Sequence, residues 1–246
     1  VGGILDTILN RLSVYLEKAD ALQRKVKGAM VYPVTVLVVA LAVVVLLLVK
    51  VIPVFQKMFA EFNSALPGPT QMVINVSEFM QAWIVYILIA LGASLFAFFQ
   101  ARRRSRVFRY RTDAVFLRMP IVGPLLRKVA TARFSRTLGT MLSSGVPILD
   151  ALDIVARTAG NLVVEEALLK TRAAISQGRT IAEPLAESKV FPSMVVQMVA
   201  VGEQTGAMDA MLQKIADFYD DEVDTAVSAL TQLLEPLMIV FLGGTV

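Results

Sequence analysis

From Gly28 to Val49 the chain reads GAMVYPVTVLVVALAVVVLLLV, a run of 22 residues without a charged side chain. At about 1.5 Å per residue, an α-helix of this length crosses the roughly 30 Å hydrocarbon core of a bilayer. A second uncharged run extends from Phe79 to Ala101, with Trp and Tyr near one end and Arg102–Arg104 after the other. Such residues are typical anchors at membrane faces. Both runs therefore predict transmembrane helices, over residues 29–49 and 79–101.

The composition excludes several classes of chemistry. Of the 246 residues 56% are hydrophobic and 18% charged, and neither cysteine nor histidine occurs. Thiol nucleophiles, disulfides, zinc sites with Cys or His ligands, and His-based triads are therefore excluded. No phosphate-binding P-loop or G-x-G-x-x-G motif is present, and neither uncharged run carries the polar groups expected of a transporter. We therefore expect neither an enzyme nor a cofactor, and the membrane-enzyme and transporter alternatives are disfavoured.

The distribution of lysine and arginine predicts the orientation. Five such residues precede the first uncharged run, two lie in the segment 50–78, and nine lie between 102 and 128. By the positive-inside rule the segment 50–78 is exported, and the segments on either side of the two spans are cytoplasmic. The basic cluster Arg102–Arg111 adjoins a span and has only two aromatic residues between its arginines. We therefore expect it to meet anionic lipid headgroups rather than nucleic acid.

The two ends of the chain are related. GILDTILNRLSVYLEK, beginning at Gly3, aligns with GAMDAMLQKIADFYDD, beginning at Gly206, and the same register places Pro33 on Pro236. Because Pro33 opens the first span, Pro236 is predicted to open a third, of which residues 236–246 are the start. Residues 1–28 are then the end of a first cytoplasmic helical domain. The repeat predicts a fragment of a longer protein with two related cytoplasmic units.

The segment 102–235 has the patterns of an all-helical domain. Apolar residues recur at helical spacing in two stripes, where the methionines are interpreted as packing residues: Phe134, Leu138, Met141 and Leu142, and then Met208, Met211, Leu212, Ile215 and Tyr219. Between the stripes lie several helix-breaking signals: Gly145 with Pro147, Gly160, Gly178, a Thr180–Glu183 capping box, Phe191–Ser193, and Gly202 to Gly206. These patterns predict an antiparallel bundle of about six helices.

Two acidic runs could bind a divalent cation. They are Glu165–Glu166 and the run that contains Asp220, Asp221, Glu222 and Asp224. A solvated acidic helix face is the favoured interpretation of both, and the residues leave the alternative of a cation site open.

Three stretches resemble a known family. ARFSRTLGTMLSSGVPILDAL (132–152), FPSMVVQMVAVGEQTGAMDAMLQKIADFYDDEV (191–223) and LLEPLMIVFLG (233–243) are similar to the repeated domain of the type II secretion F and type IV pilus platform proteins. TAGNLVVEEA (158–167) looks more like the pilus branch. The resemblance implies a multi-pass protein of the bacterial inner membrane with two cytoplasmic helical domains and three spans, on which the repeat and the charge pattern agree.

The resemblance also implies a function. A cytoplasmic hexameric ATPase would dock on the bundle, and its motion would lift pilin subunits from the bilayer into a growing fibre. Implied partners are this ATPase, pilin or pseudopilin subunits, other inner-membrane assembly proteins, a second copy of the chain in a dimer, and the lipid bilayer. The alternative is the F protein of a type II secretion system.

Eight residues are candidates for holding the bundle or for contacting partners: Arg133, Arg136, Gly145, Pro147, Glu203, Gly206, Glu235 and Pro236. Charged residues such as Glu203 recur within the apolar motifs of the matched stretches, which motivates the choice. The equally weighted alternative for Glu203 is a pair with an arginine of its own bundle.

Overall fold

The computed structural model describes residues 24, 28, 31–32, 34–61 and 68–245. All elements within these residues are helical, which confirms the predicted all-α fold class. The chain divides into two compact units: Val1–Gly28 with Ser105–Leu230, and Ala29–Arg104 with Thr231–Val246. Pro33 and almost all of the predicted domain end 1–28 lie outside the described residues, so the expectations about them stay predictions.

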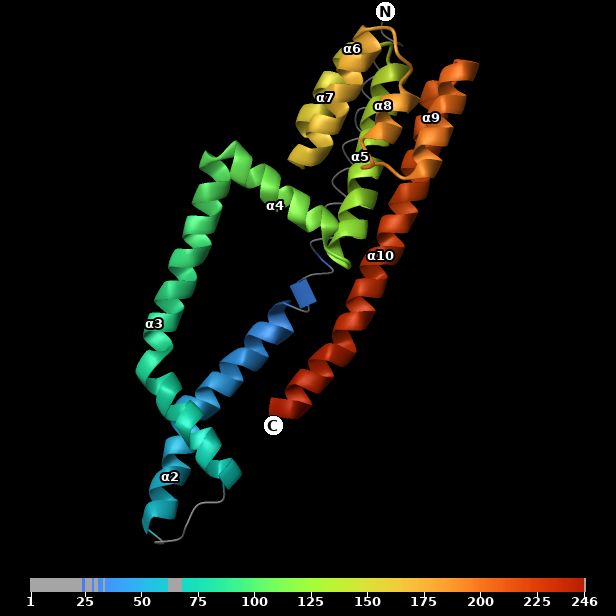
Figure 1. Ribbon diagram of the computed structural model, residues 1–246. Helices are drawn as coiled ribbons and strands as arrows, with labels where there is room; N and C mark the ends of the chain where they lie inside the picture. Colours follow the sequence, from blue (N-terminus) through green and yellow to red (C-terminus); the bar gives the residue numbers. More distant parts are fainter. Residues whose placement is uncertain (1–23, 25–27, 29–30, 33, 62–67, 246) are drawn as a thin grey trace, which may run out of the picture. The chain divides into compact units, whose positions relative to one another are not determined.

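The first unit is a helical bundle (Figure 1). Its helices are α4 (Arg106–Arg118), α5 (Val122–Ser143), α6 (Ile148–Thr158), α7 (Leu162–Ser176), α8 (Ala182–Glu187), α9 (Ser193–Thr205) and the first part of α10 (Met208–Thr245). Neighbours along the chain pack against each other from α4 to α9, and α4 also packs against α7. Short turns between sequential helices therefore produce the bundle, as the spacing of the breaks predicts.

The described part of the bundle contains seven helices, counting the first part of α10, where about six were predicted. Helix α4 ends at Arg118 because Met119 precedes Pro120 and takes an extended conformation, with φ −64° and ψ 136°. The chain then turns closely, since a Cβ on Gly123 would lie 2.5 Å from the carbonyl oxygen of Leu117. Only a residue without a side chain fits this contact between the start of α5 and the end of α4.

The glycine that ends α9 was predicted correctly, whereas two other signals were wrong. Gly206 caps α9 in the left-handed conformation, with φ 72°. Gly202 lies inside α9, where its missing side chain lets the Cα of Met208 approach to 3.1 Å from an added Cβ. The predicted capping box does not form, because no side chain caps α8 at Ile181 and Glu183 instead pairs with Arg179 at 3.4 Å.

The core of the bundle contains residues from both predicted stripes. Leu138 on α5 and Leu212 and Ile215 on α10 are fully buried, together with Leu152, Leu168 and Leu185. The rings of Phe134 and Phe191 pack against each other at a tilt of 48°, with 4.8 Å between their centroids. Burying each such side chain contributes roughly 1.5–3 kcal/mol. The interpretation of these stripes as packing surfaces is therefore confirmed for these residues.

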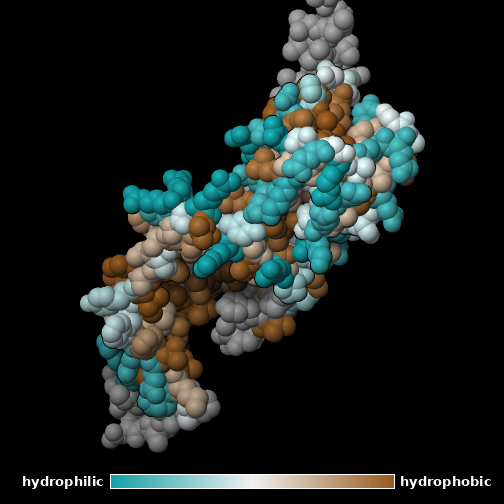
Figure 2. Space-filling model, turned by 45° about the horizontal axis from the view of Figure 1, so that its top comes forward, coloured by the Kyte–Doolittle hydropathy of each residue, from teal (hydrophilic) through white to brown (hydrophobic). Residues whose placement is uncertain are grey.

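The second unit consists of long apolar helices. Residues 34–46 are helical and continue through a π-helix, η1 (Leu47–Val51), into α2 (Ile52–Glu61); the next helix is α3 (Gly68–Arg104). Many of their apolar side chains are exposed, among them Ile89 at 64% and Phe96 at 71%. Figure 2 shows hydrophobic side chains gathered along these helices and hydrophilic ones spread over the bundle. A lipid environment would cover such surfaces.

Among the described residues, three ranges are long and apolar enough to cross a membrane: Val34–Met58, Thr70–Arg104 and Met208–Val240. The third includes the bundle part of α10, and its uncharged portion follows Glu235. The segment 50–78, expected as a loop between spans, is largely helical, because α2 and the start of α3 occupy it.

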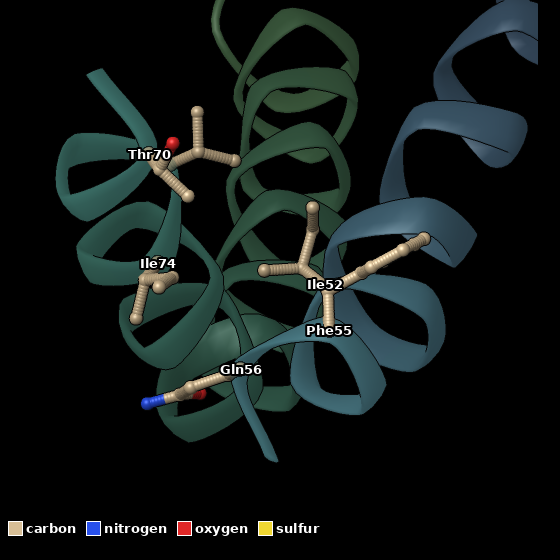
Figure 3. Close-up of a pocket in the computed structure, with 6 residues that line it drawn as sticks. Ile52, Phe55, Gln56, Thr70 and Ile74 are labelled. Carbon is tan, nitrogen blue, oxygen red and sulfur yellow. The ribbon is translucent and has the colours of Figure 1, made fainter. Parts of the chain in front are cut away.

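Side-chain contacts join α2 and α3. Gln56 donates a hydrogen bond of 2.9 Å to Glu78, and the buried hydroxyl of Ser77 donates to the carbonyl of Leu48 in η1. A small apolar pocket of about 140 Å³ lies between the two helices. Figure 3 shows Ile52 and Phe55 on one wall and Thr70 and Ile74 on the other. Because ligand pockets usually exceed about 300 Å³, we interpret it as a packing gap.

Candidate functional site

A buried arginine joins α5 to α10. The side chain of Arg136 is only 7% exposed; it donates a hydrogen bond of 3.1 Å to Asp217 and forms a second ion pair with Asp220. Two turns earlier on α5, Lys128 pairs with Glu222 at 2.7 Å. A buried guanidinium requires compensating charge, because removing it from water costs several kcal/mol. These ion pairs therefore hold α10 in one register against α5.

The same two helices approach closely at a glycine. A Cβ added to Gly139 would lie 3.1 Å from the Cβ of Leu212, so the backbones meet without an intervening side chain. The neighbouring residue of α10, Met211, lies 3.2 Å from a Cβ built at Gly202 of α9. Helix α10 thus packs closely against both α5 and α9, with little room for sliding.

Glu203 has a structural partner that neither expectation named. Both of its carboxylate oxygens accept a hydrogen bond of 3.0 Å from the backbone N–H of Ile181. Ile181 is the N-cap residue of α8, so a side chain from α9 satisfies a donor at the start of α8. Among the described residues, Glu203 forms no ion pair with an arginine of the bundle, which was the alternative expectation.

Replacing Glu203 with alanine should destabilise the bundle by about 1–2 kcal/mol, because a helix-start N–H loses its acceptor. Glu203→Gln keeps a neutral acceptor oxygen and should lose less than half as much. Thermal unfolding of the purified chain in detergent, followed by circular dichroism, measures both. Equal melting temperatures for wild type and Glu203→Ala would contradict this role.

The eight candidate residues do not come together in one site. Arg136 faces α10, whereas Arg133 lies beside the turn between α6 and α7, where its Nη1 is 3.6 Å from a Cβ built at Gly160. Gly145 and Pro147 form the exposed turn between α5 and α6. Gly206 caps α9. Pro236 lies within α10, and the side chain of Glu235 lies outside the described residues.

The sequence patterns missed a buried carboxylate on α4. Asp113 is 2% exposed and accepts a hydrogen bond of 2.9 Å from the backbone N–H of Leu162 at the start of α7. Arg106 reinforces the contact by pairing with Glu165 at 3.0 Å. The sequence offered one signal for this site, since Asp113 is the single acidic residue of α4. Its partner, 49 residues away, has no signature in the sequence.

The acidic runs pair with cations of the bundle. Glu166 pairs with Lys170 at 2.7 Å, and this hydrogen bond raises the pKa of the lysine above its usual value. In the second run, Asp220 pairs with Arg136 and Glu222 with Lys128. Among the residues that the structure describes, no group of three acidic side chains is placed to hold a metal ion.

The comparisons with known proteins decide the family. The sequence profile of type II secretion system protein F matches residues 1–53 and 134–246. The chain belongs to the type II secretion system protein F family. Relatives in this family carry names from type IV pilus assembly or from type II secretion. The individual relatives are therefore needed to distinguish these two branches. Arg136 and Glu203 both lie in the second matched segment, whereas α4 lies between the two segments.

Individual relatives of the chain are named as pilus assembly or secretion proteins. The type IV pilus assembly protein PilC of Myxococcus xanthus is 59% identical over 246 residues, which cover the whole chain and 59% of the relative. PilC of Thermus thermophilus is 46% identical over 98% of the chain and 59% of its own length. Type II secretion system protein F of Vibrio cholerae is 32% identical over 99% and 60%. The chain thus spans about 60% of these relatives.

Proposed function

We propose that this chain belongs to the inner-membrane platform protein of a type IV pilus assembly machine. The higher identity to the PilC proteins than to the secretion protein favours the pilus branch. In this proposal residues 102–235 form a cytoplasmic domain, the segment 50–78 is exported, and the uncharged helices 29–49, 79–101 and 236–246 lie in the membrane. The positive-inside rule supports this orientation.

The mechanical role that we propose rests on helix α10. It extends as one helix from Met208 to Thr245, with Pro236 inside its last part. Its first half is fixed in the bundle by buried Leu212, Ile215 and Val223 and by the ion pairs with α5. Its last part after Glu235 is uncharged. A rigid helix transmits displacement along its axis, whereas a flexible linker would absorb it.

The platform would therefore act mechanically and not as an enzyme. A cytoplasmic assembly ATPase would bind the bundle, and its motion would pass through α10 to the membrane, where pilin subunits are extracted and polymerised. A second copy of the chain and other inner-membrane assembly proteins would complete the platform. Nucleic acid has no role in this proposal.

Deleting the gene from its own bacterium should abolish surface pili and twitching motility and leave the secretion of exported enzymes intact. Electron microscopy counts the pili, and plate assays follow twitching and secreted enzymes separately. Complementation with the full gene should restore pili. Normal pili with lost secretion would replace the pilus assignment with the secretion-system alternative.

A further inference from the structure

Helix α4 has an outward face in which valines alternate with arginines. Val107 is 65% exposed and Val115 is 61% exposed. Arg111 and Arg118, which are also exposed, follow them at helical spacing, so the four side chains lie on one face. The turn after α4 adds exposed Ile121, at 61%. The opposite face packs into the bundle through Asp113 and Leu117.

The arginines of α4 divide into two groups. Arg106 pairs with Glu165 of α7, and Arg109 lies 4.0 Å from the carboxylate of Asp113, so both have acidic partners within the bundle. Within the part of the chain that the structure describes, no ion pair forms at Arg111 or Arg118. Among the described residues, the outward face therefore offers two cations that form no ion pair, interleaved with exposed apolar side chains.

This combination matches the chemistry of a membrane interface. Arginine stems lie along apolar surface while their guanidinium groups reach phosphate oxygens, which they bind in a bidentate manner. Exposed valines between them would enter the headgroup layer, where each Å² of covered apolar area contributes roughly 25 cal/mol. Helix α4 also begins next to a candidate membrane span in the sequence. Only Ser105 separates it from α3, a helix apolar enough to span a bilayer.

We propose that α4 and the turn at Met119–Ile121 bind the membrane surface through anionic phospholipid headgroups. Val107 and Val115 insert at headgroup depth, and Arg111 and Arg118 bind phosphate. The bundle is then attached to the bilayer by a surface of its own, in addition to the covalent connections at its ends. This attachment does not depend on which assembly machine the chain serves.

The absence of cysteine from the sequence permits a direct test. A Val115→Cys variant of the full chain carries an environment-sensitive fluorophore and is reconstituted in vesicles of phosphatidylcholine with about a quarter phosphatidylglycerol. A nitroxide attached to the lipid near the headgroup serves as the quencher. The control probe is Val201→Cys on α9, where the native side chain is 48% exposed. We expect roughly threefold stronger quenching at Val115 than at Val201.

Charge variants identify the headgroup contact. Arg111→Glu with Arg118→Glu should reduce quenching at the Val115 probe to the level of the Val201 probe. The matched control, Lys189→Glu with Lys214→Glu, changes the charge equally at exposed positions outside α4 and should leave quenching unchanged. Vesicles of pure phosphatidylcholine should also reduce quenching at the Val115 probe. This second comparison uses no charge variant, so it does not depend on the folding of one.

Three results would overturn the proposal. The first is equal quenching of the two probes in the anionic vesicles. The second is quenching at Val115 that the arginine variants and the lipid charge leave unchanged. The third is shielding of the Val115 probe from a soluble quencher in detergent without phospholipid, which would assign the face to a second copy of the chain.

Discussion

Inserting seven glycine and serine residues between Leu230 and Thr231 is expected to abolish pilus assembly, with a decrease in piliated cells of roughly tenfold or more. The insertion point lies within α10, at the boundary of the two compact units. A flexible segment there would leave the bundle folded and the apolar helices intact. It would remove only the continuous helical connection that we propose as the route for displacement.

A helical insertion of equal length is the matched control. Seven residues rich in alanine, glutamate and lysine add two turns, about 700° of rotation, so the following side chains return to within about 20° of their original direction. This variant should keep a substantial part of the pili. Immunoblots of membrane fractions must show equal amounts of both variants. Normal piliation with the flexible insertion would contradict the mechanical role of α10.

Replacing both acidic partners of Arg136 with amides should give the largest loss of stability. Asp217→Asn with Asp220→Asn leaves a guanidinium that is only 7% exposed without compensating charge. Breaking a buried pair from one side typically costs 3–5 kcal/mol, and the 54% exposure of Asp217 favours the lower end, about 3 kcal/mol. Thermal unfolding of the purified chain in detergent, followed by circular dichroism, measures the loss.

Removing the buried charge itself should rescue the double variant. Adding Arg136→Met to the two amide substitutions replaces the unpaired guanidinium with an apolar side chain of similar length, and most of the lost stability should return. Lys128 and Glu222 stay unchanged in all of these variants, so the other ion pair between α5 and α10 is kept throughout. Failure of Arg136→Met to restore the melting temperature would show that the charge of Arg136 is not the cause.

Local patterns predicted much of the fold. Leu138, Leu212 and Ile215 are buried as the apolar stripes indicate, because a helix with one apolar face must bury that face. Gly206 ends α9 because glycine takes the left-handed conformation without strain. The apolar helices followed from the length and hydropathy of the uncharged runs alone.

Predictions failed where the tertiary contacts outweighed the local signal. Gly202 has the residue type of a helix end, yet it lies inside α9 and permits close packing against α10. Thr180 and Glu183 have the spacing of a capping box, but a carboxylate from another helix satisfies the N–H of Ile181. Spacing within one segment contains no information about the groups that a neighbouring helix presents.

The sequence alone thus determined the helical class, the apolar runs, the core stripes and most helix ends, since these depend on residues within a few turns of each other. The tertiary structure alone decided the partners of the charged residues. Arg136 meets Asp217 and Asp220, which follow 81 and 84 residues later. Glu203 meets Ile181, and Arg111 faces outward without an ion pair among the described residues. Partner choice depends on how helices pack, which is a property of the whole bundle.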